Sequence, residues 1–145
     1  MDEHMTTAWE EAKRGLEEGG IPIGSVLVVG GRVVGRGHNR RVQGDSSVLH
    51  AEMDCLENAG RLTSKDYGRS VLYSTLSPCD MCAGAVLLYK IPKVVVGENV
   101  NFKGAEEHMR KRGVEVEVLN HPAIIEFFRN WVDENPELWN EDIGE

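Results

Sequence analysis

Two cysteines separated by two residues are the feature of the sequence with the clearest capacity for chemistry. Cys79 and Cys82 fall in a segment predicted to be helical, and side chains three positions apart share one face of a helix, so both sulfurs can reach one metal ion. In a first helical turn, the helix dipole and the unpaired amides also favour the thiolate that binds metal. The chain has three cysteines, an odd number that suits metal or redox chemistry better than a disulfide framework.

A histidine and a glutamate complete the set that a catalytic metal needs. A catalytic zinc has three protein ligands and leaves its fourth position to water, and His50 is the natural third ligand because it also lies near a predicted helix start. The H-x-E segment at His50 and the P-C-x-x-C segment that ends at Cys82 together resemble the signature of zinc deaminases. We therefore expect His50, Cys79 and Cys82 to hold Zn²⁺. Glu52, which reaches the same region without binding the metal, is the expected catalytic residue.

Two other interpretations of the cysteines are weaker. A redox Cys-x-x-Cys pair of the thioredoxin type should open a helix after the first strand of a small βαβ unit, whereas this pair comes late in the chain. A structural zinc site needs four protein ligands, and Cys55 is the only cysteine left to supply one. We interpret Cys55 as a small buried hydrophobe, which leaves a catalytic zinc as the favoured interpretation.

The segments that must position these residues alternate between helix and strand. Apolar spacing, caps and breakers predict helices over residues 5–16, 48–58, 77–89 and 105–112, and one between Pro122 and Pro136. Short β-branched runs predict strands over residues 23–29, 32–37, 71–75, 93–96 and 114–119. Ser47 and Ser77 are the expected caps of two helices, and the glycines at 30 and 31 suit a tight antiparallel hairpin.

This order of elements favours one α/β domain over residues 1–145. A chain of that length buries about 68–70% of its unfolded surface, and a composition of 41% hydrophobic and 28% charged residues is that of globular proteins. Alternating helices and strands place helices on both faces of a sheet. We expect a three-layer α/β/α sandwich around a mixed sheet of about five strands.

The net charge bears on partners and location. A formal net charge of −8 repels polyphosphate backbones, so nucleic acid is a poor candidate partner. The longest apolar runs, such as residues 83–89, fall well short of the roughly 18 residues of a membrane helix, so no membrane partner is expected. The N-terminal residues lack the basic-then-apolar pattern of a secretion signal. We expect a cytoplasmic protein, with the nucleus as the alternative.

Longer stretches of the chain resemble the cytidine deaminase superfamily and, within it, the fungal-type cytosine deaminases. The metal segments are shared by many deaminases, whereas residues 96–102 and 141–145 are distinctive of the subfamily, and residues 18–24 and 35–39 also match. The resemblance implies a single zinc-dependent deaminase domain with a cytidine deaminase-like fold. Its implied reaction hydrolyses cytosine, a small pyrimidine base, to uracil and ammonia, as in pyrimidine salvage. It also implies a homodimer.

The same resemblance assigns residues to substrate binding. Asn39 and the backbone amide of Ala51 are expected to contact the ring carbonyl; the fungal enzymes carry glycine at the position of Ala51, but the amide survives that change. Asp142 is expected to accept from ring N1, which is substituted in a nucleoside, and so to reject cytidine. The C-terminal tail is the expected lid. The side chains expected to pack around the ring are Phe102, Trp139 and Ile23.

Plainer interpretations of these residues remain open from the sequence alone. Without the resemblance, Asn39 is a turn residue, Asp142 belongs to a solvated acidic end, and the two aromatic side chains belong to an ordinary core. The enzyme alternatives are deaminases of guanine, of a nucleoside or of a tRNA adenosine. The alternative from another class is a non-catalytic, zinc-stabilised interaction domain, against which Glu52 and the open ligand position argue.

Overall fold

Five strands form one mixed sheet in the computed structural model, which describes residues 1–145. The strands are β1 Gly24–Val29, β2 Arg32–His38, β3 Ser70–Leu76, β4 Lys93–Glu98 and β5 Glu115–Val118. Their order across the sheet is β2-β1-β3-β4-β5. Strand β1 is antiparallel to both β2 and β3, whereas β3, β4 and β5 run parallel. The predicted mixed sheet and its opening hairpin are thus confirmed.

The hairpin between β1 and β2 depends on two glycines. Gly30 and Gly31 have φ angles of 57° and 79°, a backbone conformation that two-residue hairpin turns require and that side chains with a Cβ resist. Val29 consequently pairs directly with Arg32. The turn keeps β1 and β2 together at one edge of the sheet.

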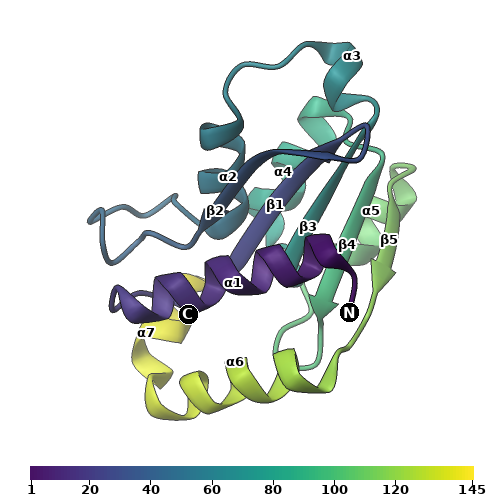
Figure 1. The fold of residues 1–145 in the computed structure, drawn as a ribbon. Coiled ribbons are helices and arrows are strands. Elements are labelled where there is room, and N and C mark those ends of the chain that lie inside the picture. The colour runs from purple at the N-terminus through teal and green to yellow at the C-terminus, as the bar shows by residue number, and fades with distance from the viewer.

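Helices cover both faces of the sheet, as predicted. The helices are α1 Glu3–Glu17, α2 Ala51–Ala59, α3 Ser64–Tyr67, α4 Asp80–Tyr89, α5 Glu106–Lys111, α6 Pro122–Glu134 and α7 Pro136–Asp142. Figure 1 shows α1 crossing one side of the strands, with α6 near it and α4 and α5 on the opposite side. The short helices α3 and α7 were not predicted. None of the seven helices combines the length and apolar character that crossing a membrane requires.

The two faces of β1 bury separate apolar clusters. Leu27 packs with side chains of α2, α4 and α5, including Cys55 and Met109, whereas Val26 and Val28 pack with α1 and α6. This alternation follows from the two-residue period of a strand. Cys55 is fully buried, in line with its interpretation as a small hydrophobe. A third cluster joins Ile21, Ile23, Ala51, Leu76, Phe128, Trp131 and Trp139.

Two helix starts lie later in the chain than predicted. Helix α2 begins at Ala51 with His50 as its cap. The hydroxyl of Ser46, the residue before the expected cap Ser47, accepts from the amides of Val48 and Leu49, so these residues form a separate turn. Helix α4 begins at Asp80 with Cys79 as its cap. Its expected cap, Ser77, is buried and its hydroxyl serves other partners (below). Both corrections move metal-ligand candidates to the helix ends themselves.

Helix α2 lies directly against the backbone of β2. A Cβ atom at Gly37 would lie 2.5 Å from the Cys55 amide nitrogen, and one at Gly35 would lie 2.6 Å from the Ala59 Cβ. Glycine therefore lets the helix and strand approach closely. Such close contact fixes the middle and the C-terminal end of α2 against β2 and so helps to position the whole helix, which carries Glu52 in its first turn.

A buried carboxylate joins α1 to β2. Glu11 is 2% exposed; it accepts from Arg36 Nε at 2.8 Å and lies 2.9 Å from His38 Nδ1. The other ring nitrogen of His38 lies 2.8 Å from a Glu18 carboxylate oxygen. Burial by itself would raise the pKa of Glu11, but hydrogen bonds from His38 and Arg36 lower that pKa to about 2. The pKa of His38 is raised, chiefly by its bond to Glu11.

We expect Glu11→Gln to lower the free energy of unfolding at pH 7 by about 2–3 kcal/mol. A depressed carboxyl pKa stabilises the fold above its unfolded value of 4.5, and this contribution disappears as the pH falls from about 4.5 to about 2. Urea unfolding at several pH values measures both effects. Glu10→Gln is the control, because Glu10 is exposed and its contact with Arg36, at 3.8 Å, is a weak surface ion pair. Equal acid sensitivity of wild type and Glu11→Gln would contradict the prediction.

Candidate active site

Three ligand atoms from two helix ends meet beside the sheet. His50 caps α2, Cys79 caps α4, and Cys82 lies in the first turn of α4. The Nδ1 atom of His50 lies 3.4 Å from the sulfur of Cys79 and 3.8 Å from that of Cys82. All three ligand atoms lie within 4.8 Å of one another. The structure therefore brings together the residues that the sequence analysis assigned to the metal.

The spacing of these atoms fits a tetrahedral zinc ion. Zinc bonds of about 2.3 Å to sulfur and about 2.0–2.1 Å to nitrogen place tetrahedral ligands about 3.5–3.8 Å apart. The observed nitrogen-to-sulfur separations of 3.4 and 3.8 Å lie close to these values. Two sulfurs with one imidazole are also a donor set that zinc prefers. No fourth histidine, cysteine or carboxylate belongs to the group, so one position stays open to a small molecule.

Protons in the metal-free site are held unequally. A hydrogen bond from Cys82, and then one from His50, lower the pKa of Cys79 to about 4 despite its burial. The pKa of Cys82 is raised, first by the bond it donates to Cys79 and then by burial. Burial lowers the pKa of His50, but Cys79, Asp142 and Glu52 outweigh it and raise that pKa to about 9. Cys79 is thus a thiolate at neutral pH, whereas His50 and Cys82 each hold a proton that a bound cation would displace.

Glu52 lies in the first turn of α2 and is 5% exposed. Burial is the main cause that raises the pKa of its carboxyl to about 7, with the His50 charge opposing. A carboxyl with a pKa near neutrality can both take and give a proton at physiological pH. It does not belong to the group of atoms that could share one ion with His50. Its place and its pKa suit proton transfer next to a metal.

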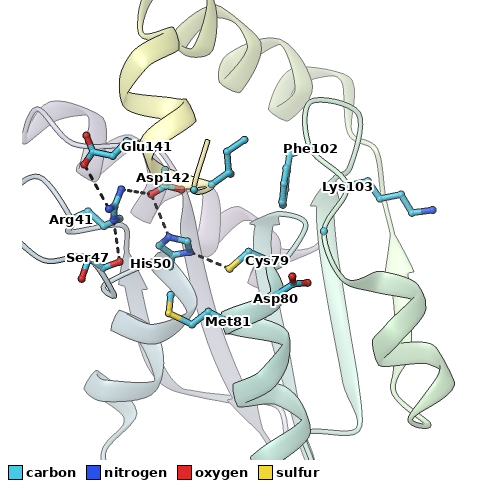
Figure 2. Close-up of a pocket in the computed structure, with 13 residues that line it drawn as sticks. Arg41, Ser47, His50, Cys79, Asp80, Met81, Phe102, Lys103, Glu141 and Asp142 are labelled. Carbon is cyan, nitrogen blue, oxygen red and sulfur yellow. Dashed lines mark hydrogen bonds and ion pairs between the residues drawn. The ribbon is translucent and has the colours of Figure 1, made fainter.

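A narrow pocket lies against the metal ligands. It is lined by Ile23, His50, Glu52, Leu76, Ser77, Cys79, Phe102, Trp139, Asp142 and Ile143. A wider cleft shares five of these residues and extends to Arg41 and Glu141, as Figure 2 shows. The aromatic walls are ordered, since Phe102 meets Trp139 edge to face with centroids 5.6 Å apart. The lining of the pocket therefore combines apolar side chains with two buried acids, Glu52 and Asp142.

Of the six predicted substrate contacts, four line this pocket and a fifth lies next to it. Ile23, Phe102, Trp139 and Asp142 line it, while Ala51 packs behind it in the apolar cluster of Ile23 and Trp139. Asn39, the sixth, is fully buried and does not line either cavity. Its amide nitrogen donates to Asp142 Oδ1 at 2.9 Å. An amide has two N–H donors, so the second stays available for a ligand.

The loop after β4 holds Phe102 in place. Buried Glu98 accepts from the backbone amides of Val100 and Asn101 at 2.7 and 2.9 Å, and from the Asn101 side chain at 2.7 Å. Asn101 also donates to the carbonyl oxygen of Ile125 in α6. Residues 96–102, which the sequence analysis found distinctive, thus build a hydrogen-bonded frame for one wall of the pocket.

Sequence reasoning missed four residues at the site. Ile143 lies in a stretch that resembled the subfamily, but only its neighbour Asp142 was assigned. Ser77 was read as a helix cap, whereas its hydroxyl donates to Glu106 at 2.6 Å and accepts from the Gly104 amide at 2.9 Å. Leu76 and Arg41 carried no signal at all, because nothing in their local sequence shows that they face a pocket.

Comparisons with known proteins agree with this geometry. Residues 1–98 match the family described as the cytidine and deoxycytidylate deaminase zinc-binding region. A cytosine deaminase of Candida albicans is 50% identical over 142 residues, covering 97% of this chain and 95% of that protein. A tRNA-specific adenosine deaminase of Bacillus subtilis is 44% identical over 123 residues, covering 84% and 76%.

A solved structure extends the comparison to the fold. The guanine deaminase of Nitrosomonas europaea superposes with a TM-score of 0.76 at 21% identity, covering 88% of this chain and 82% of that one. At this level of identity the likeness concerns the fold, the five-stranded sheet with helices on both sides. Family match, relatives and metal geometry together show that the chain belongs to the zinc-binding cytidine and deoxycytidylate deaminase family.

Proposed function

We propose that this zinc-dependent deaminase hydrolyses free cytosine to uracil and ammonia. The observation that carries the proposal is the pocket itself, because Glu52, Asp142 and two of the three metal-ligand candidates line the same narrow cavity. The 50% identity to a cytosine deaminase over 97% of the chain supports the same substrate. Cytosine fits because its exocyclic amine and its ring N1–H lie at opposite positions of one small flat ring.

The metal chemistry and the protein chemistry are separable. His50, Cys79 and Cys82 would hold the ion, and Zn²⁺ when bound acts as a Lewis acid that brings the pKa of water from 15.7 towards about 7. Glu52 takes the proton that the attacking water gives up. It delivers this proton to ring N3, and then carries the remaining proton of the water oxygen, now bonded to C4, to the departing amine. Water adds to C4, the C4–N bond breaks, and the carbonyl of uracil remains.

Three polar groups, from Asp142, Asn39 and the backbone of Ala51, are proposed to recognise the cytosine ring. Asp142 is 7% exposed, and its Oδ1 already accepts from Asn39, so Oδ2 is the oxygen that accepts from ring N1–H. Asn39 and the Ala51 amide donate to the ring carbonyl. A ribose on N1 would remove the N1–H donor and leave Oδ2 of this buried carboxylate without a hydrogen bond, which costs about 1–3 kcal/mol. This end of the pocket therefore rejects nucleosides.

Apolar side chains complete the recognition. Phe102 and Trp139 are expected to pack on the ring edge and face, with Ile23 beneath them. Helix α7 carries Trp139 and Asp142, both of which line the pocket, and its position suits the proposed role of the C-terminal tail as a lid. A closed cover excludes bulk water from the reaction, which strengthens every polar contact inside.

The alternatives are less consistent with this pocket. A tRNA-specific adenosine deaminase is a 44% identical relative, but a polynucleotide needs an open path past α7 and a surface without a net charge of −8. A nucleoside lacks the ring N1–H that Asp142 would accept, and guanine has two fused rings where cytosine has one. A non-catalytic interaction domain would not need a buried acid with a pKa near 7 at the metal.

The cellular setting is part of the proposal. Helix α4 exposes a row of apolar side chains, with Leu88 70% and Tyr89 41% exposed, and burying such a row between two copies would build the expected homodimer. We place the protein in the cytoplasm, where cysteines stay reduced and able to bind metal. The reaction would serve pyrimidine salvage.

A substrate panel tests the proposal. We expect release of ammonia from cytosine, with kcat/KM at least about a hundredfold above that for cytidine, guanine or adenine, since a missing buried hydrogen bond alone gives such discrimination. Absorbance changes and ammonia assays with and without a chelator provide the readout. Faster turnover of cytidine than of cytosine would refute the role of Asp142, and full activity in chelator would refute the zinc requirement.

The proton carrier is tested by Glu52→Gln. We expect kcat to fall by about 10⁴-fold or more, because the amide cannot move protons, while one zinc ion per chain is retained. Metal analysis and steady-state kinetics measure the two quantities. Glu57→Gln, on the exposed side of the same helix, is the matched control and should keep wild-type rates. Loss of zinc from Glu52→Gln would instead make Glu52 a ligand.

Zinc affinity should rise with pH. The metal displaces a proton from His50, whose pKa is about 9, and another from Cys82, whose pKa is raised. Affinity should therefore grow by about tenfold to a hundredfold per pH unit between pH 6 and pH 8. Competition with a chromophoric chelator, calibrated against free zinc at each pH, measures it. A flat affinity over this range would show that the ligands are already deprotonated.

A further inference from the structure

The guanidinium of Arg41 joins the pocket wall to the C-terminal helix. Its Nη1 lies 3.6 Å from Asp142 Oδ1, and its Nη2 lies 3.6 Å from a Glu141 carboxylate oxygen. Its Nε donates to the carbonyl oxygen of Ser47 at 3.2 Å. Figure 2 shows these three contacts converging on one side chain. With only 12% of its side chain exposed, Arg41 is a buried cation between the loop after β2 and α7.

The backbone of Arg41 acts on the same acid by a second route. Its amide donates to Asn39 Oδ1 at 3.0 Å. This bond sets the orientation of the Asn39 amide, whose nitrogen then donates to Asp142 Oδ1 at 2.9 Å. Arg41 therefore contacts Asp142 through its guanidinium and, through its backbone amide, orients Asn39, which is the hydrogen-bond donor of Asp142.

Asn39 donates a hydrogen bond to Oδ1 of Asp142, and the side chains of Arg41 and His50 lie within ion-pair distance of the same oxygen. Besides Asn39 and Arg41, His50 Nε2 lies 3.4 Å from Oδ1. Oδ2 has no donor from the protein and is the atom left for a ligand. Because a carboxylate is planar, holding Oδ1 determines where Oδ2 points.

Helix α7 needs such an anchor. It has seven residues, and a helix that short is unstable without tertiary contacts. Trp139 packs its middle against Phe128. Its last turn, with Glu141 and Asp142, has Arg41 as its cationic partner.

We propose that Arg41 is a positioning residue that docks the last turn of α7 over the pocket and so sets the preference for a free base over a nucleoside. The inference rests on the proposed function for its substrate, but the docking of α7 does not. Arg41 acts through Asp142: it holds Oδ1, leaves Oδ2 facing ring N1, and keeps closed the side on which a ribose would enter.

Charge-matched variants of the holoenzyme test this role. Arg41→Gln removes the cation, Arg41→Lys keeps the charge without the planar fork, and Glu141→Gln removes the other acid that Arg41 contacts. Arg40→Gln is the control, because Arg40 is in the same loop but pairs with Asp54 at 3.1 Å. We expect Arg41→Gln to raise KM for cytosine at least tenfold with kcat lowered less than threefold. The cytosine-to-cytidine ratio of kcat/KM should fall at least tenfold.

Hydrogen exchange of residues 136–145 supplies a readout independent of turnover. Arg41→Gln should speed exchange there at least tenfold, with zinc content and melting temperature close to wild type. The exchange rates of Arg41→Lys and Glu141→Gln should lie between those of wild type and Arg41→Gln, and Arg40→Gln should exchange at the wild-type rate. Unchanged exchange and KM in Arg41→Gln would overturn the proposal, as would an equal effect of Arg40→Gln. If Arg41→Gln does not fold, Glu141→Gln decides by the same measurements. A wild-type enzyme inactive on cytosine would refute the proposed function, yet the exchange experiment would still judge the anchor.

Discussion

The site depends on the meeting of two helix ends at one point beside the sheet. Helices α2 and α4 share a face of the sheet and a common apolar cluster, and their caps are His50 and Cys79 themselves. Each ligand is therefore fixed by backbone geometry as well as by its rotamer. Because the separations already match those of tetrahedral zinc, binding the ion requires proton release more than movement.

That arrangement forces acids into a buried space. Glu52 follows His50 by two residues and must enter the core with α2, where burial raises its pKa to about 7. Asp142 arrives from the other end of the chain, and its pKa is raised by burial while His50, Asn39 and Arg41 oppose the rise. The surroundings of the two acids suit the different roles proposed for them: burial leaves Glu52 with a pKa near 7, whereas Asp142 lies beside His50, Asn39 and Arg41.

The sequence predicted what is encoded locally. Ligand spacing, the hairpin glycines and the alternation of helix and strand depend on neighbours within a few residues, and the mixed three-layer fold followed from them. Helix starts were misplaced because the hydroxyls of Ser46 and Ser77 are used elsewhere. Arg41 was missed since its acidic partners lie a hundred residues away, a contact that no local pattern reveals.

The family match covers the metal site but only part of the pocket. It ends at residue 98, and it includes Glu52 and all three metal-ligand candidates, while Phe102, Trp139 and Asp142 lie beyond it. The chain is similar over 97% and 84% of its length to relatives named for cytosine and for tRNA adenosine, and we propose that the residues beyond 98 help to set which base this chain accepts. Arg41 lies within residues 1–98 and contacts Glu141 and Asp142 beyond them. In our proposal, it is the side chain that links the metal-binding part of the chain to the part that selects the substrate.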